Sequence, residues 1–98
     1  MRHQKSKQLD QDKVEQAAEI LKSIAHPLRL RIAELLQSGE MTVGQIQSEL
    51  GVSQSLTSQQ LLLMKARGIL KSRKSGKSVH YFIARPQVIQ VIECLRKC

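Results

Sequence analysis

The sequence predicts a mainly α-helical domain with a small β-hairpin, in the order ααααββα. Three observations predict this fold class. Apolar residues recur at helical spacing through most of the chain. The run TVGQIQSELGVSQSLTSQQL holds two helical patterns separated by a glycine turn. Two short alternating runs then flank Ser75-Gly76-Lys77, which has the residue types of a tight hairpin turn.

The length of 98 residues indicates one small domain. Residues 1–11 are largely polar and basic without periodicity, so we expect a mobile N-terminal arm followed by a single domain over residues 12–98. A domain this small buries only roughly 60 to 65% of its unfolded surface. Dimerisation is therefore an expected source of further stability.

Two helices are predicted ahead of the helix-turn-helix stretch. Asp12 is the expected N-cap of the first, with Glu15 as its capping-box partner, and this helix ends near Ser23. Pro27 suits the first turn of the second helix, which Gly39 ends. Their apolar stripes are Val14, Ala17, Ala18, Leu21 and Ile24, then Leu28, Ile32, Leu35 and Leu36.

The third and fourth predicted helices form the helix-turn-helix. Thr42 caps the third, with Gln45 at the capping-box position, and Gly51 makes the turn. Ser53 caps the fourth, which Gly68 ends, and this is the candidate recognition helix.

A hairpin and a last helix complete the predicted order. Residues 69–73 and 79–83 are the expected strands, and Pro86 opens a fifth helix with the stripe Val88, Val91, Ile92 and Leu95. A hairpin directly after a recognition helix is a wing, so the predicted architecture is a winged helix-turn-helix.

The distribution of charge indicates a nucleic-acid partner. The net charge is +8 and the pI is near 10.0. Residues 50–92 contain no acid, yet carry Lys65, Arg67, Lys71, Arg73, Lys74, Lys77 and Arg85. The only aromatic residues, Tyr81 and Phe82, offer no stacking platform for single strands, so double-stranded DNA is the expected partner.

Neither a membrane nor a secretory route is expected. The chain has no apolar run approaching the ~18 residues that span a bilayer, and its start lacks the apolar core of a signal peptide. We therefore expect a cytoplasmic protein that does not associate with membranes.

Two sets of side chains are candidates for DNA contact. On the recognition helix, Gln54, Ser55, Ser58 and Gln59 fall on one polar face, where glutamine and serine can hydrogen-bond base edges in the major groove. In the wing, Lys71, Arg73, Lys74 and Lys77 can follow a phosphate backbone or enter a minor groove. The alternative for each set is a solvated surface without a DNA role.

The runs IAHPLRLRIAELL, TVGQIQSELGVSQSLTSQQL and ARGILKSRKSGKSVHYFI resemble the ArsR/SmtB winged helix-turn-helix repressors. The resemblance implies a homodimer paired through the terminal helices. It also implies an imperfect palindromic operator with half-sites roughly 34 to 36 Å apart. The four positions on the recognition helix match the DNA-contacting positions of that family. This chain departs from the family at Thr57, Gln60 and Leu62, where a small apolar residue, a histidine and a polar residue are usual.

The metal sites of sensing members of that family lack their ligands here. Thr42 and Gly44 stand where one class has the cysteines of a pattern like ELCVCDL. Arg85 and Gln87 stand where another class has aspartate and histidine at the start of the last helix. None of these four can bind a soft metal in that way, so zinc sensing through either pattern is not expected.

Cys94 and Cys98 are the remaining candidates for a signal site. Their spacing places both sulfurs on one side of the last helix. Such a pair can bind arsenite or another thiophilic ion, or be oxidised, although two sulfurs fill only half of a tetrahedral zinc site. The alternative is that Cys94 packs and Cys98 is a frayed chain end, with no cofactor at all.

The predicted function is that of a sequence-specific transcriptional repressor released by a thiol-directed signal. Two alternatives stay open: a winged helix that binds protein or RNA, and a DNA-binding regulator without sensing thiols. No serine, histidine and acid arrangement indicates an enzyme. His26 and His80 are isolated from other ligand types and are interpreted as structural.

Overall fold

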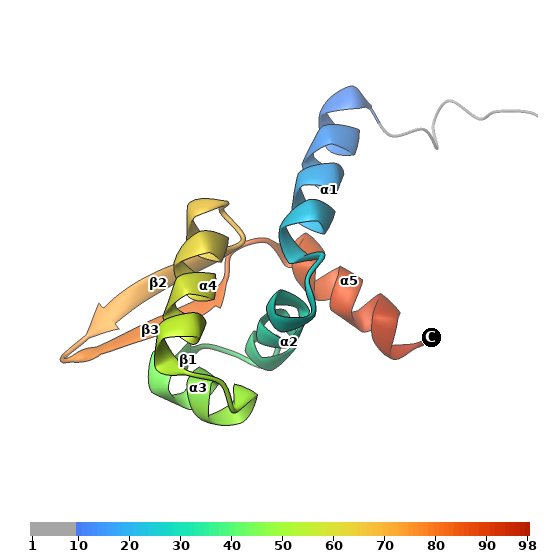
Figure 1. Ribbon diagram of the computed structural model, residues 1–98. Helices are drawn as coiled ribbons and strands as arrows, with labels where there is room; N and C mark the ends of the chain where they lie inside the picture. The colour runs from blue at the N-terminus through green and yellow to red at the C-terminus, as the bar shows by residue number, and fades with distance from the viewer. Residues whose placement is uncertain (1–9) are drawn as a thin grey trace, which may run out of the picture.

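The computed structural model describes residues 10–98 and has the predicted fold class (Figure 1). The elements are α1 (Gln11–Ile24), α2 (Pro27–Leu36), β1 (Met41–Thr42), α3 (Val43–Leu50), α4 (Gln54–Ala66), β2 (Leu70–Ser75), β3 (Ser78–Ile83) and α5 (Pro86–Arg96). Helices α3 and α4 form the helix-turn-helix, and β2 with β3 forms the wing beside α4. Most of the arm predicted for residues 1–11 lies outside the described residues.

Helix α1 begins earlier than predicted. Asp10, and not Asp12, is its N-cap: the Asp10 carboxylate accepts a hydrogen bond of 2.8 Å from the backbone N–H of Lys13. Asp12 lies in the first turn instead, where its negative charge interacts favourably with the positive end of the helix dipole. Gln11, predicted to lie in the arm, is the first residue of α1. Glu15 is not the predicted capping-box partner of Asp12, and its carboxylate accepts from the Gln11 side chain at 3.1 Å.

The predicted caps of the helix-turn-helix are confirmed. The backbone N–H of Thr42 donates to Gln45 Oε1 at 2.9 Å, and the backbone N–H of Gln45 donates to Thr42 Oγ1 at 3.1 Å, which is a complete capping box. Gly51 turns the chain with φ of 69°, a backbone conformation that favours glycine. Ser53 Oγ then accepts from the backbone N–H of Leu56 at 3.0 Å and caps α4.

The sheet has one strand more than predicted. Its order is β1-β3-β2, with Met41 opposite Tyr81 and Thr42 opposite His80. The observed order is therefore ααβααββα, because β1 is too short for a pattern of alternating residues to reveal it. The hairpin turn is as predicted: Ser75 pairs with Ser78 around Gly76 and Lys77.

The core lies between the sheet and the helices, with α1 contributing only Ile20 and Ile24 from its C-terminal half. Its fully buried side chains include Ile32, Ile46, Leu61, Met64, Ile69, Leu70 and Val88. Thr57 is also buried, and its hydroxyl donates to the Ser53 carbonyl at 2.9 Å, which satisfies the hydrogen-bonding need of this polar group inside the core. No helix within residues 10–98 is long and apolar enough to cross a membrane.

Candidate DNA interface and effector helix

Helix α4 turns its predicted base-reading face to solvent. Gln54, Ser55 and Gln59 are exposed and Ser58 is half-buried, while Leu61 and Met64 on the other side are in the core. The face lies on the first two turns of the helix, next to the positive end of its dipole. Polar side chains and an N-terminal dipole are therefore presented together.

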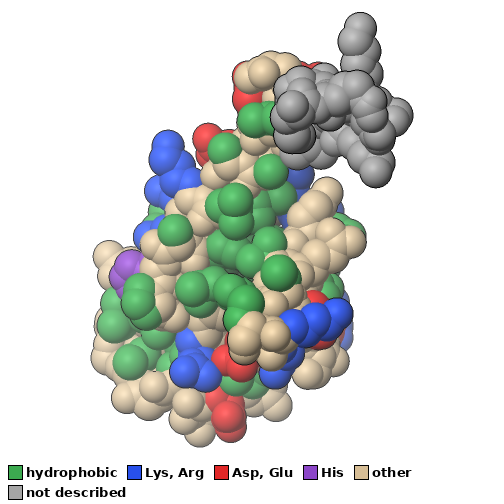
Figure 2. All heavy atoms as spheres, turned by 90° about the vertical axis from the view of Figure 1, so that its right-hand side faces the viewer, with side chains coloured by type: hydrophobic (Ala, Val, Ile, Leu, Met, Phe, Trp, Pro, Cys, Tyr) green, Lys and Arg blue, Asp and Glu red, His purple; other side chains and the backbone are tan. Residues whose placement is uncertain are grey.

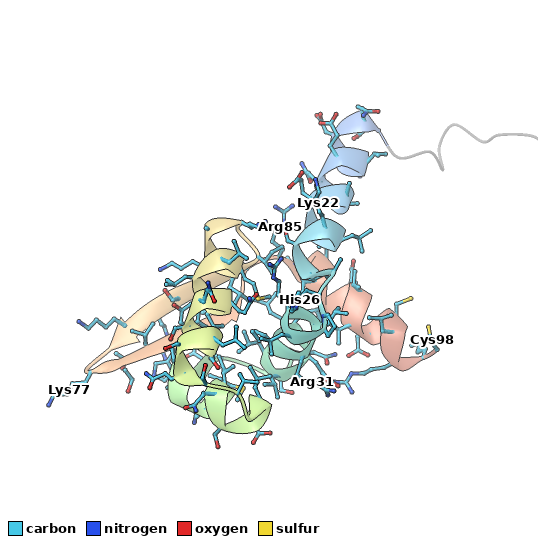
Figure 3. All side chains as sticks on the ribbon, in the orientation of Figure 1. Lys22, His26, Arg31, Lys77, Arg85 and Cys98 are labelled. Atoms are coloured by element: carbon cyan, nitrogen blue, oxygen red, sulfur yellow. The ribbon has the colours of Figure 1, made fainter. Side chains whose placement is uncertain are left out.

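The wing distributes its predicted cations over both faces of the hairpin. Lys71, Lys74 and Lys77 are exposed, and Figure 3 shows Lys77 at the hairpin tip, away from the helices. Because side chains alternate along a strand, Lys74 shares a face with Ser72. Ser72 Oγ accepts from Lys65 Nζ of α4 at 2.8 Å, so this face is the one on the α4 side. Lys71 lies on the opposite face.

The fourth predicted wing cation, Arg73, is held by an acid that sequence reasoning did not identify. Arg73 Nε donates to Glu40 Oε2 at 3.2 Å, and an Nη2–H donates to the other carboxylate oxygen. The hydrogen bonds from Arg73 hold the pKa of the Glu40 carboxyl below its ordinary value, and the same contact raises the pKa of the guanidinium. His80 Nδ1 lies 3.5 Å from Glu40 Oε1.

The short strand β1, which no sequence pattern revealed, explains this contact. Arg73 is opposite His80, and His80 is opposite Thr42, so the register brings Glu40 onto the same face of the sheet two residues before Thr42. Glu40 is 33 residues from Arg73 in the chain, outside the acid-free segment. The folded wing is therefore less uniformly basic than its sequence.

A second unpredicted contact joins the recognition helix to the N-terminal half of the chain. Arg29 of α2 donates through Nε to Gln60 Oε1 of α4 at 2.8 Å and through Nη1 to the Ser23 carbonyl at 3.2 Å. Ser23 is in the last turn of α1, where carbonyl groups lack helical partners and a cation is favourable. Gln60 is thus the α4 end of a link that runs through Arg29 to α1.

Both thiols are free and exposed, but only Cys94 lies in α5, because the helix ends at Arg96 and Cys98 follows it. Cys98 Sγ donates weakly to the Cys94 carbonyl at 3.5 Å, so the described structure has no bond between the sulfurs. No group of three or more histidine, cysteine or acidic side chains suited to a metal occurs in residues 10–98. His26 has a structural position, because its Nδ1 accepts from the backbone N–H of Leu28 at 3.1 Å and caps α2.

Helices α1 and α5 expose an apolar face. Figure 2 shows hydrophobic side chains gathered in a band on this side of the molecule. Val14, Leu21 and Leu95 are 43%, 52% and 50% exposed, and only the end of α1 is buried in the core. The predicted apolar stripes of the two terminal helices are therefore only partly buried within one chain.

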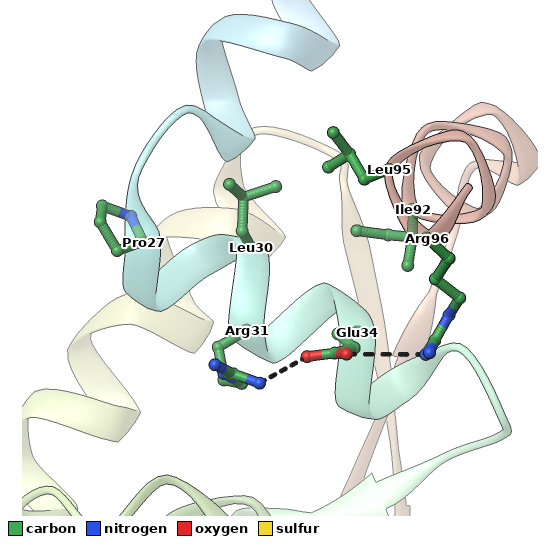
Figure 4. A pocket seen from close by; sticks show the side chains of 7 residues that line it. All are labelled: Pro27, Leu30, Arg31, Glu34, Ile92, Leu95 and Arg96. Carbon is green, nitrogen blue, oxygen red and sulfur yellow. Dashed lines mark hydrogen bonds and ion pairs between the residues drawn. The ribbon is translucent and has the colours of Figure 1, made fainter. Parts of the chain in front are cut away.

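Two hollows adjoin this face. One, of about 380 Å³, lies between α1 and α5 and is lined by Lys13, Gln16, Ala17, Ile20, Leu21, Gln87 and Val91. The other, of about 430 Å³, lies between α2 and α5 (Figure 4). At its rim Glu34 pairs with Arg31 at 2.8 Å and with Arg96 at 3.7 Å, which joins the two helices.

A helix-turn-helix with a basic hairpin beside its second helix is the arrangement of winged helix-turn-helix DNA-binding proteins, and this chain is one of them. A profile of bacterial regulatory proteins of the arsR family matches residues 26–72, from the cap of α2 into β2.

Several curated proteins are similar along most of the chain. PagR, a transcriptional repressor of Bacillus anthracis, is 39% identical over 83 residues, which cover 84% of this chain and 83% of PagR. A biofilm growth-associated repressor of Agrobacterium fabrum is 36% identical over 80 residues, which cover 82% and 68% of the two chains. The transcriptional activator HlyU of Vibrio cholerae is 35% identical over 81 residues, which cover 83% and 75%.

Solved structures agree with this fold. Reduced HlyU from Vibrio cholerae has a TM-score of 0.81 at 32% identity, covering 88% of this chain and 90% of that one. The repressor BigR from Xylella fastidiosa has a TM-score of 0.82 at 29% identity, covering 88% of each chain. A homodimeric winged helix-turn-helix domain from Mycobacterium bovis has a TM-score of 0.74 at 28% identity, covering 92% and 85%. The chain belongs to the ArsR family and is a DNA-binding transcriptional regulator, not an enzyme.

Proposed function

We propose that this regulator binds an imperfect palindromic operator in double-stranded DNA as a homodimer and represses transcription from it. The observation that carries the proposal is the exposed polar face of α4 beside a basic wing. Gln54, Ser55, Ser58 and Gln59 read base edges, while Lys71, Arg73, Lys74 and Lys77 contact phosphates or the minor groove. A relative of similar identity is named an activator, so the sign of regulation needs its own measurement.

The partner in the dimer is a second copy of the chain, paired through α1 and α5. The exposed apolar side chains Val14, Leu21 and Leu95 on these helices support this arrangement, since burying them removes apolar surface from water. The homodimeric Mycobacterium bovis domain has the same fold. A symmetric dimer presents two copies of α4, which suits half-sites roughly 34 to 36 Å apart.

Binding to DNA from the chain's own upstream region tests this proposal. Fluorescence anisotropy with a palindromic duplex, the same duplex with one half-site scrambled, and an RNA of equal length separates the possibilities. Preference for the intact palindrome supports the regulator, and binding to RNA alone would sink it. A reporter driven by the same region then gives the sign of regulation.

The signal is proposed to act on the thiols of α5. Cys94 and Cys98 are free and exposed, and in the sequence they flank Leu95 of the apolar face through which we propose that the two subunits pair. Binding of arsenite or a thiophilic ion, or oxidation, changes the size and charge of this helix end and so the geometry of the dimer. The description of one HlyU structure as reduced fits a redox-active relative with the same fold.

Release of DNA by arsenite, cadmium or an oxidant tests the thiol proposal. The wild-type protein is expected to lose operator affinity, and a Cys94→Ser, Cys98→Ser variant is expected to retain it under the same treatment. Mass spectrometry identifies the modified residue. Equal release of DNA by both proteins would show that Cys94 and Cys98 do not sense the signal.

A further inference from the structure

We infer that Glu40 sets the DNA specificity of the wing by holding Arg73 until a phosphate at the operator replaces the carboxylate. This inference rests on the proposed operator binding. It assigns a role to an acidic residue that lies outside the predicted DNA-contacting set, and it makes Arg73 a conditional contact.

The geometry of the pair suits such an exchange. Arg73 donates to both oxygens of Glu40, through Nε at 3.2 Å and through Nη2. A planar guanidinium fork binds a phosphate in the same two-point manner as a carboxylate. The two side chains are 52% and 36% exposed, so an incoming phosphate can reach the guanidinium without opening the core.

The pair lies where the three-stranded part of the sheet ends and the two-stranded part of the wing begins. Strand β1 pairs with β3 at Met41 and Thr42 only, so the three-stranded part of the sheet ends near the rung of Arg73 and His80. Beyond that rung the hairpin is two-stranded and carries Lys74 and Lys77. Arg73 is thus at the boundary between the three-stranded and the two-stranded part of the wing, and Glu40, which precedes β1, reaches it from the three-stranded side.

Specificity follows from when the exchange occurs. While Glu40 holds Arg73, the pair adds no net charge, and its carboxylate repels nearby phosphates. On unrelated DNA nothing fixes the wing, and Arg73 stays with Glu40. At an operator, base contacts of α4 hold the wing against one phosphate, and Arg73 transfers to it. Glu40 therefore lowers affinity for unrelated DNA more than affinity for the operator.

The substitution Glu40→Gln measures this effect directly. We expect affinity for an unrelated duplex to rise at least about threefold, with the salt dependence steeper by up to about 2 for the two released arginines of a dimer. Affinity for the operator rises less, so the specificity ratio falls. Anisotropy titrations between about 50 and 200 mM salt give both quantities.

A matched control is Glu49→Gln, which removes another exposed acid lining the same shallow hollow as Glu40. In an Arg73→Ala background, Glu40→Gln is expected to change affinity no more than Glu49→Gln does. Thermal unfolding of each variant checks that the exposed substitutions leave the fold intact.

Three outcomes separate the possibilities. If Glu40→Gln and Glu49→Gln raise affinity for the unrelated duplex equally, the effect is one of net charge alone, and the inference is overturned. Weaker binding of Glu40→Gln to both duplexes overturns it in favour of a brace for the wing. A wild-type protein that prefers no palindrome contradicts the operator proposal, and with it the inference, whereas palindrome preference with no effect specific to Glu40 contradicts only the inference.

Discussion

The side of the molecule formed by α4 and the wing and the side formed by α1 and α5 differ in the kind of side chain that they expose. Figure 3 places Lys77 of the wing and Cys98, beyond the end of α5, at opposite sides of the molecule. On the DNA side, polar and basic groups are exposed on elements whose apolar side chains are buried. On the other side, apolar side chains of α1 and α5 are themselves exposed. The first side exposes polar and basic groups suited to an anion, whereas the second exposes apolar side chains that we propose a second copy of the chain covers.

The largest expected effect comes from a substitution on the exposed apolar face of α1. Leu21→Asp places a charge on the exposed face of α1, so it should prevent dimerisation without disturbing the core of the monomer. Losing the second binding unit should lower affinity for a palindromic operator by about 100-fold or more. Analytical ultracentrifugation and anisotropy measure the two consequences. Leu21→Met, which keeps an apolar side chain, should remain a dimer; a dimeric Leu21→Asp protein would contradict the assigned interface.

The next effect sharpens the DNA side. Gln54→Ala with Gln59→Ala removes two exposed side chains able to form paired hydrogen bonds to adenine, each worth roughly 1 to 3 kcal/mol of discrimination. Operator affinity should fall at least about tenfold, while affinity for unrelated DNA stays nearly unchanged. Lys74→Ala is the comparison, because loss of a phosphate contact weakens both duplexes alike. If the glutamine variant instead lost affinity for the operator and for unrelated DNA equally, these residues would contact phosphates and not base edges.

A smaller effect tests the link between the two sides. Gln60→Leu leaves the half-buried Arg29 guanidinium without its α4 partner, which should lower the free energy of unfolding by about 1 to 2 kcal/mol. Gln60→Glu keeps an acceptor and should retain stability. Gln59→Leu, one residue away on the exposed face, should change stability by less than about 0.5 kcal/mol. Chemical denaturation compares the three; similar losses for Gln59→Leu and Gln60→Leu would remove the special role of the link.

The smallest effect concerns pH. The pKa of the Glu40 carboxyl is lowered in the folded protein by its hydrogen bonds from Arg73. Its contribution to stability is therefore present above the unfolded pKa and is lost as the pH falls through the lower folded pKa. In Arg73→Gln this carboxyl should titrate closer to its ordinary value, and that part of the acid sensitivity should disappear. NMR titration of the Glu40 carboxyl measures the change, and an unchanged titration would show that Arg73 is not its partner in solution.

Local chemistry explains how much of this structure could be predicted. Thr42 with Gln45, and Ser53 after Gly51, carry their capping information within a few residues, so the helix-turn-helix was predictable. Asp10 and Asp12 both suit an N-cap, and only the backbone of the folded chain decides between them.

Contacts between distant segments were not predictable in this way. The pairing of β1 with β3, the Glu40–Arg73 contact and the Arg29–Gln60 contact each join residues more than a helix length apart in the chain. The α1 stripe shows a different limit. Helical spacing reveals that Val14 and Leu21 share a face, but not whether the chain's own core or a second copy covers them.

The two-stranded end of the wing has a consequence for how DNA is met. Between Lys74 and Val79 the hairpin has hydrogen-bonded neighbours only across its own turn, and its side chains there are largely exposed. Such a segment opens locally at little cost, so its amide protons should exchange with solvent much faster than those of α4. A ribbon of this kind can also twist more than the three-stranded sheet behind it. The tip of the wing can therefore adjust to the width of a groove, while the recognition helix keeps its place on the core.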